Sequence, residues 1–135
     1  MKRDEILKME AGREMDALIA EKVMDWKNIH KTTEYEDPDT IHMTGEMNPF
    51  IVGNVAWVDW EVEIFPFSTS LLDAWMVVEK LRSKYLISVR SDFNHYGCAI
   101  RLLGLDDLVA VTYGDTAPLA ICRAALLAAM KASEK

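Results

Sequence analysis

The stretch from Ala117 to Met130 constrains the fold more than any other part of this 135-residue chain. Arg123 is its only charged residue, whereas an ordinary surface helix carries a polar face along its whole length. The run Gly114–Pro118 is typical of a helix start, because Asp and Thr cap helices and proline fits the first turn. We therefore predict a terminal helix covered on more than one side. A sheet would cover one face, and in a chain this short a second subunit is a natural cover for the other.

Arg123 lies among leucines and alanines in this predicted helix. A guanidinium keeps its proton, so a buried one needs an anionic or strongly accepting partner. The sequence leaves that partner open as a carboxylate of this protein or an anionic ligand. The plainer alternatives are an internal ion pair and a surface arginine whose charged end reaches water.

The composition favours one soluble globular domain over residues 1–135. The net charge of -7 argues against polymeric nucleic acid as a partner, although a small anionic ligand needs only one or two arginines. We find neither a signal-peptide pattern nor an apolar run long enough to cross a membrane, so we expect a protein of the host cell cytoplasm with no membrane partner. Cys98 and Cys122 fit no metal or redox spacing and are predicted to be reduced core residues.

The order of the predicted elements indicates an α+β domain. We expect an N-terminal helix over residues 3–24, broken at Gly12, then a variable loop over 27–54 that is rich in turn-forming residues. The core follows over 55–135. Its predicted elements are a strand near Trp60–Ile64, a helix over Leu71–Leu81, strands at Tyr85–Arg90, Cys98–Leu103 and Leu108–Tyr113, and the terminal helix. They would form a mostly antiparallel sheet of about four strands packed with helices.

Catalytic and metal-binding patterns are missing from the sequence. There is no glycine-rich phosphate loop, zinc spacing or nucleophile elbow, and His30, His42 and His95 fall in three separate regions. The acidic Glu61 and Glu63 are typical of the solvated face of a strand. We therefore predict no catalytic residue, no metal and no cofactor, and expect that the protein is not an enzyme.

Binding of a nucleotide-like ligand has better support. Two predicted helices begin with polar side chains, Ser68–Ser70 and Asp115–Thr116, and the free N–H groups of a helix start suit phosphate. Asp115 would instead accept from a ribose hydroxyl, and Asn94 could read a base edge. Aromatic residues that could stack on a base lie nearby in the sequence: Phe65, Phe67, Trp75, Phe93 and Tyr96. Each feature also has an ordinary explanation, since caps begin helices and aromatics fill cores.

Three blocks of the sequence resemble a family of phage and prophage proteins, the ABA sandwich proteins. The blocks are Glu10–Trp26, Pro66–Leu81 and Asp115–Leu126, which occur in the family's order and together cover about a third of the chain. Residues 27–64 depart from the Trp- and Pro-rich stretch of many members, so nothing is carried over to that segment.

The ABA sandwich family in turn resembles the first-described Thoeris anti-defence proteins of phages. Those proteins are sponges: they sequester the cyclic ADP-ribose isomer made by a bacterial TIR-domain defence protein, and they do not degrade it. Some also hold cyclic oligonucleotides at a separate site, within a hexamer built from dimers. The resemblance thus implies a phage anti-defence protein that forms at least a dimer.

The resemblance and the residues together suggest a ligand site. We expect stacking by Phe93 and by Trp75 or Phe67, base or ribose contacts by Asn94, Asp115 and Thr116, phosphate contacts by Ser68 and Thr69, and charge neutralisation by Arg123. Candidates for a subunit boundary are Arg13, Asp16 and Trp26. Two other functions stay open, a hydrolase of the same signal and a phage structural or protein-binding module.

Overall fold

The computed structural model describes residues 2–32, 42–46, 51–52, 55–56, 61–104 and 107–133. Two short helices begin the chain, α1 (Arg3–Lys8) and α2 (Arg13–Lys22). Gly12 separates them with φ 159° and ψ -171°, a backbone conformation that side-chain-bearing residues rarely adopt. The predicted break of the N-terminal helix at Gly12 is therefore confirmed.

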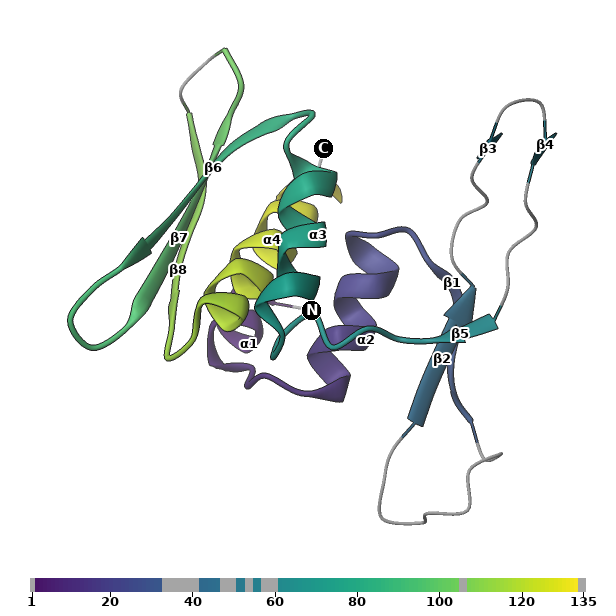
Figure 1. The fold of residues 1–135 in the computed structure, drawn as a ribbon. Coiled ribbons are helices and arrows are strands. Elements are labelled where there is room, and N and C mark those ends of the chain that lie inside the picture. The colour runs from purple at the N-terminus through teal and green to yellow at the C-terminus, as the bar shows by residue number, and fades with distance from the viewer. Residues whose placement is uncertain are drawn as a thin grey trace.

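The terminal helix α4 (Ala117–Ser133) is the centre of the molecule (Figure 1). Thr116 caps it, since the Leu119 N–H donates to the Thr116 hydroxyl over 3.3 Å. The sheet formed by β6, β7 and β8 packs on one side of α4, and α1, α2 and α3 pack on its other sides. The predicted burial on more than one side is confirmed, but this chain supplies the cover itself. The expectation that α4 needs a second subunit to cover it is therefore wrong.

The sheet beside α4 consists of β6 (Tyr85–Ser91), β7 (Tyr96–Leu102) and β8 (Leu108–Gly114). The strands are antiparallel and lie in the order β6-β7-β8. Alternate residues of each strand face α4, and Cys98, Ile100, Ala110 and Thr112 are buried there. The two predicted hairpins are thus confirmed.

Helix α3 (Leu71–Leu81) packs beside α4 and contacts β6. Ser70 caps it by accepting a hydrogen bond of 3.4 Å from the Asp73 N–H, as the cap pattern predicts. Its buried residues are Ala74, Val77 and Val78, which form the side that faces the core.

A second antiparallel sheet lies on the far side of the helices (Figure 1). It contains β1 (Lys27–Thr32), β2 (His42–Glu46) and β5 (Glu61–Glu63) in the order β1-β2-β5, and β3 (Ile51–Val52) pairs separately with β4 (Val55–Ala56). The α+β class of antiparallel sheet and helices is confirmed. The strand predicted near Trp60–Ile64 joins this second sheet instead of the one beside α4, and Trp60 itself lies outside the described residues.

The expectation of a loop over 27–54 is wrong for the parts that the structure describes. Strands β1 and β2 pair from Lys27 opposite Glu46 to Thr32 opposite His42. The register shifts between Lys27 and His30, and Asn28 has a positive φ of 55°. This irregular and largely polar strand lacks the alternation by which a strand is recognised in a sequence.

No helix within the described residues is long and apolar enough to cross a membrane.

Candidate functional site

Most of the predicted ligand residues lie at one end of the molecule. The N-terminal ends of α3 and α4 point the same way, and the β6–β7 hairpin lies at that end as well (Figure 1). The strand register fixes the hairpin there, because Tyr96 at its base pairs with Gly114 just before α4. This end combines two helix starts with a tight hairpin.

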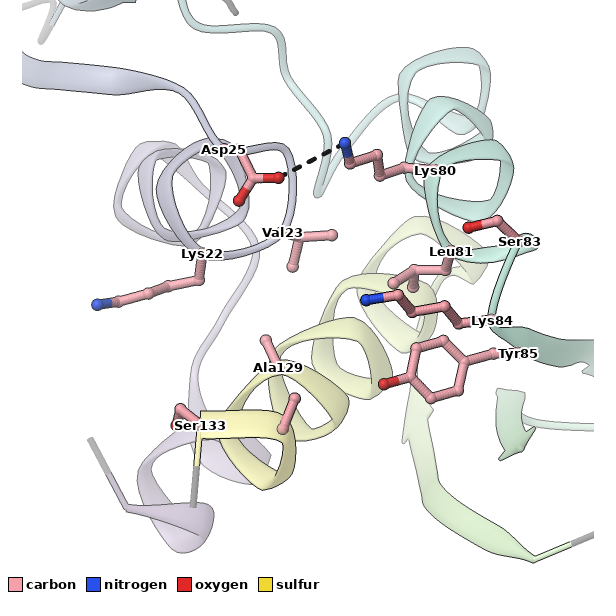
Figure 2. Close-up of a pocket in the computed structure, with 11 residues that line it drawn as sticks. Lys22, Val23, Asp25, Lys80, Leu81, Ser83, Lys84, Tyr85, Ala129 and Ser133 are labelled. Carbon is pink, nitrogen blue, oxygen red and sulfur yellow. Dashed lines mark ion pairs between the residues drawn. The ribbon is translucent and has the colours of Figure 1, made fainter. Parts of the chain in front are cut away.

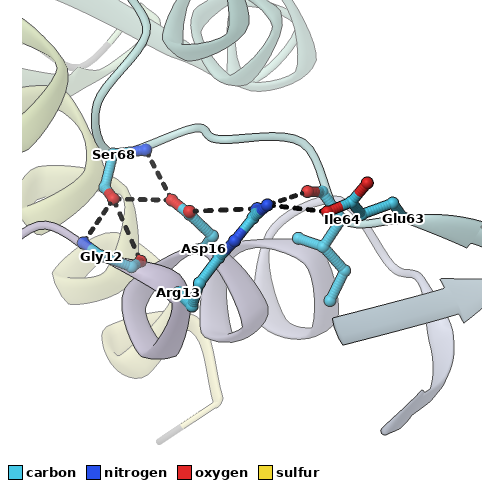
Figure 3. Close-up of polar contacts among 6 residues, drawn as sticks. All are labelled: Gly12, Arg13, Asp16, Glu63, Ile64 and Ser68. Carbon is cyan, nitrogen blue, oxygen red and sulfur yellow. Dashed lines mark hydrogen bonds and ion pairs between the residues drawn. The ribbon is translucent and has the colours of Figure 1, made fainter. Parts of the chain in front are cut away.

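Ser68 belongs to a buried polar network at this end (Figure 3). Its backbone N–H donates to Asp16 Oδ1 over 2.7 Å, and its hydroxyl donates to the same oxygen over 2.6 Å. The hydroxyl also lies 3.2 Å from the Gly12 carbonyl oxygen and accepts from the Gly12 N–H over 2.9 Å. Ser68 is fully buried and its polar groups are paired, so the prediction that it binds phosphate is wrong.

Asp16 and Arg13 extend this network toward the second sheet. Arg13 donates to the Ile64 carbonyl over 2.8 Å, forms an ion pair of 2.9 Å with Glu63, and lies 3.9 Å from Asp16 Oδ2. Burial raises the pKa of the Asp16 carboxyl above its ordinary value, while the hydrogen bonds from Ser68 and the charge of Arg13 oppose the rise. Asp16 is 1% exposed, so the expectation that it lies at a subunit boundary is wrong, and Arg13 has its partners within the chain.

Trp26 and Phe67 belong to the core. Their rings pack edge to face with centroids 6.3 Å apart, and the Phe65 ring lies 5.4 Å from Trp26 and 5.9 Å from Phe67. Phe67 is completely buried and Trp26 is 4% exposed. The predictions of ligand stacking by Phe67 and of a subunit boundary at Trp26 are therefore wrong, because both rings are covered by this chain.

Arg123 is bound to the main chain rather than to an anion. Its Nε and Nη2 donate to the Met9 carbonyl over 3.1 and 2.8 Å, and its Nη1 donates to the Tyr113 carbonyl over 2.7 Å. The guanidinium thus joins the α1–α2 connection to the end of β8. Neither an internal carboxylate nor an anionic ligand is needed to satisfy it, so the expected partner of Arg123 is corrected to two carbonyl groups.

The other predicted ligand residues are accessible at this end. Phe93 is 100% exposed and Trp75 is 50% exposed. Phe93 and Asn94 lie at the hairpin tip, beyond the pairing of Tyr96 with Gly114, and Asp115 and Thr116 are exposed at the start of α4. Thr69 is also exposed, at the start of α3.

The hairpin that carries Phe93 is braced by contacts of Asp92 and His95. The Asp92 N–H donates to the His95 carbonyl over 2.7 Å, and the Asp92 carboxylate lies 3.3 Å from His95 Nε2. The His95 ring packs edge to face on Tyr113 with centroids 5.2 Å apart. These contacts brace the hairpin backbone and His95, while the Phe93 ring is fully exposed to solvent.

Sequence reasoning missed an exposed apolar stripe on α3. Leu71, Leu72, Trp75 and Met76 are 57%, 81%, 50% and 37% exposed. The available signal was that Leu71, Leu72, Trp75 and Met76 recur at helical spacing on a face of their own, on the opposite side of α3 from Ala74, Val77 and Val78.

A hollow lies at the opposite end, where α2, α3 and α4 terminate (Figure 2). Its volume is about 510 Å³, and Lys22, Lys80 and Lys84 line it. Lys80 pairs with Asp25 over 3.5 Å. Helix C-termini carry partial negative charge that lysines stabilise, so this cluster has a structural explanation and is a poor site for an anion.

Cys98 and Cys122 are buried free thiols, which confirms their prediction as reduced core residues. Burial raises the pKa of Cys98 to about 12 and that of Cys122 still further, so both stay protonated. In the part of the chain that the structure describes, no three His, Cys, Asp or Glu side chains are placed to hold a metal ion.

The comparisons with known proteins bear on this arrangement. The family model described as the phage ABA sandwich domain matches residues 17–126, which is well over half of the chain. This protein belongs to the phage ABA sandwich family. The resemblance seen in the sequence is thereby confirmed.

A solved structure shows the same ABA sandwich fold. It is the 2.0 Å crystal structure of a phage protein from Bacillus cereus ATCC 14579, which matches with a TM-score of 0.58 and 24% identity over 90% of this chain and 93% of that chain. At this identity the likeness shows the fold alone. A comparison with curated proteins gave no match.

Proposed function

We propose that this ABA sandwich protein is a phage anti-defence sponge. It would bind and sequester a cyclic ADP-ribose isomer made by a bacterial TIR-domain immune protein, without degrading it. Membership of a phage family supports the part of the proposal that makes this a phage protein. The observation that carries the proposal is the fully exposed Phe93 ring beside Asn94 in the β6–β7 hairpin, whose base at Tyr96 pairs with Gly114 just before α4.

The chemistry of these residues suits the adenosine part of such a ligand. Phe93 offers a flat apolar face for the adenine ring, and stacking of this kind contributes about 1–3 kcal/mol per base. The Asn94 amide can donate to and accept from a base edge, and the Asp115 carboxylate can accept from ribose hydroxyls. The contacts of Asp92 and His95 already brace the hairpin backbone, which would reduce the conformational entropy lost when the ligand binds.

A sponge needs affinity and no turnover. Its capacity equals its own concentration, so it requires neither a nucleophile nor a general acid or base. The proposed function is therefore that of a binding protein and not of an enzyme.

We further propose that the protein forms at least a dimer through the apolar stripe of α3. Leu72 alone is 81% exposed, and it lies beside Leu71, Trp75 and Met76 in one contiguous stripe. Two copies that pack these stripes together would remove the apolar surface from water. Light scattering at micromolar concentration tests for the dimer. Leu72→Asp is expected to give a monomer. The control Leu103→Asp, at the far end of the sheet, is expected to leave the assembly intact.

The stripe also supports a second candidate function, docking of a different protein. If the wild type is a monomer in that measurement, the stripe is free to bind such a partner. Protein docking without nucleotide binding would then replace the sponge proposal.

A thermal-shift panel tests the proposed ligand. A ligand that binds only the folded state stabilises it by RT ln(1 + [L]/Kd), about 4 kcal/mol at 1,000-fold excess over Kd. We expect a cyclic ADP-ribose isomer to raise the Tm by several degrees and linear ADP-ribose to raise it much less, with cyclic oligonucleotides as a further arm. No shift with any cyclic nucleotide would contradict the proposal.

A further inference from the structure

The outer face of the β6-β7-β8 sheet has no helix packed on it. Figure 1 shows α4 on the inner face and none of the helices on the outer one. A hollow of about 360 Å³ lies on this outer face, lined by Ser88, Arg90, Gly97, Ala99, Arg101 and Tyr113. The face is therefore open to a ligand along the middle of the sheet.

The strand register fixes the order of these residues. Arg90 pairs with Gly97, and Gly97 pairs with Tyr113, so the three form one row across the sheet. Ser88 and Ala99 form the next row, and Arg101 lies in the third. Two residues of a strand span about 6.7 Å, so the two arginine Cα atoms stand about 13 Å apart along the strands. Their long side chains can converge from opposite ends of the hollow.

The middle strand leaves room between the two arginines. Gly97 and Ala99 are the two smallest residue types, and they form the floor of the hollow. The Tyr113 ring lies beside Gly97, since a Cβ atom added at Gly97 would stand 3.4 Å from Tyr113 Cε1. Small residues thus line the bottom of the hollow, and an aromatic ring lines one side of it.

The two arginines on this face differ from Arg13 and Arg123 in their partners. Arg13 and Arg123 are held by short hydrogen bonds within the chain. The Arg101 side chain has no hydrogen bond or ion pair with any residue that the structure describes. Arg90 has one distant ion pair, 3.8 Å from Asp92. Arg90 and Arg101 are therefore available to an external anion, and the planar guanidinium suits phosphate oxygens.

We propose that the outer face of this sheet binds the diphosphate of a nucleotide-type ligand through Arg90 and Arg101. This inference rests on the proposed function for the identity of the ligand, and it supplies the positive charge that Arg123 cannot. Phe93 follows Arg90 by three residues in the same hairpin, so a base stacked at the tip lies next to a diphosphate on the sheet. Tyr113 would pack against the part of the ligand between them.

Isothermal titration of single variants tests the role of the arginines. With a cyclic ADP-ribose isomer as the probe, we expect Arg101→Gln and Arg90→Gln each to weaken binding about tenfold or more, since hydrogen bonds between charged groups are the strong ones. Arg101→Lys should lose part of that affinity, because lysine keeps the charge but cannot form the bidentate hydrogen bonds of a guanidinium. The matched control is Arg82→Gln, an exposed arginine at the end of α3 that pairs with Glu79. It should bind within twofold of wild type.

A second probe, ADP at millimolar concentration, separates this inference from the proposed function. If the cyclic isomer fails to bind but ADP binds wild type and loses affinity in Arg101→Gln, the diphosphate surface is supported and the sponge proposal fails. If the cyclic isomer binds wild type and the Arg90→Gln/Arg101→Gln double variant equally, the inference is overturned while the sponge proposal stands. Binding of neither probe to wild type overturns both. The Tm of each variant without ligand should match wild type, because neither arginine supports the fold.

Discussion

The Asp16 carboxylate accepts two hydrogen bonds from a single residue, Ser68, which lies 52 positions later in the chain. The same Ser68 hydroxyl accepts from the Gly12 N–H. One side chain on the first turn of α2 thereby fixes the loop that leads into α3. The end of the molecule that carries the candidate site depends on this buried contact.

The first prediction concerns Asp16, the acceptor of the two hydrogen bonds from Ser68. Asp16→Ala leaves the buried N–H of Ser68 without a partner, which we expect to lower the free energy of unfolding by about 3 kcal/mol. Asp16→Asn keeps an oxygen where Oδ1 now lies and should change stability by less than half as much. Urea unfolding measures both. Equal losses in the two variants would show that charge, and not the acceptor, stabilises the contact.

Asp16 should also contribute to the pH dependence of the protein's stability. Because burial raises the pKa of Asp16 in the folded chain above its ordinary value of 3.8, the folded state binds this proton more tightly than the unfolded state does. The stability of wild type relative to Asp16→Asn should therefore rise as the pH falls through the folded pKa toward 3.8. Unfolding both proteins at a series of pH values checks the sign. A relative stability that falls over this range would contradict the raised pKa.

Arg123→Ala should affect folding and not ligand binding. The substitution removes the donors to the Met9 and Tyr113 carbonyls, so we expect it to lower the free energy of unfolding by about 2–4 kcal/mol. Arg82→Ala, in which an exposed ion pair is lost, should stay within about 0.5 kcal/mol of wild type. Below its Tm, the Arg123 variant should keep wild-type ligand affinity. A variant of unchanged stability that no longer binds would restore Arg123 as a ligand residue.

Phe93→Ala should weaken ligand binding and leave folding unchanged, the opposite of what we expect for Arg123→Ala. A fully exposed ring makes little contribution to the fold, so the Tm without ligand should not change. Loss of base stacking should weaken binding of a cyclic ADP-ribose isomer about tenfold or more. Leu103→Ala, a half-exposed apolar residue at the far end of the sheet, is the control and should bind normally. Unchanged affinity in the Phe93 variant would remove the main support for the proposed site.

The parts of the fold that the sequence predicted are those with a strong local signal. The apolar run of α4, its Thr116 cap and the break at Gly12 are all visible within a few residues. The strands β1 and β2 were missed because they carry mostly polar residues and an irregular register. Local signals could not show that β1, β2 and β5 form a sheet separate from that of β6, β7 and β8.

The candidate site was harder to predict because its polar residues depend on distant partners. Ser68 and Thr69 both follow the pattern of a helix start, yet Ser68 turns inward to Asp16 while Thr69 stays exposed. Arg123 reaches the Met9 carbonyl, 114 positions away in the chain. Only the folded chain shows which donors are already used and which, such as Arg101, are left for a ligand.

Capture without chemistry is the central claim, and recovery of the ligand tests it most directly. The protein is incubated with lysate from cells whose TIR-domain defence has been activated, then repurified and denatured by heat, and the released molecule is identified by mass spectrometry. We predict an intact cyclic ADP-ribose isomer, in an amount that saturates at one fixed ratio to protein and still activates its effector. A ring-opened product that increases with incubation time, or the release of no nucleotide at all, would contradict the account.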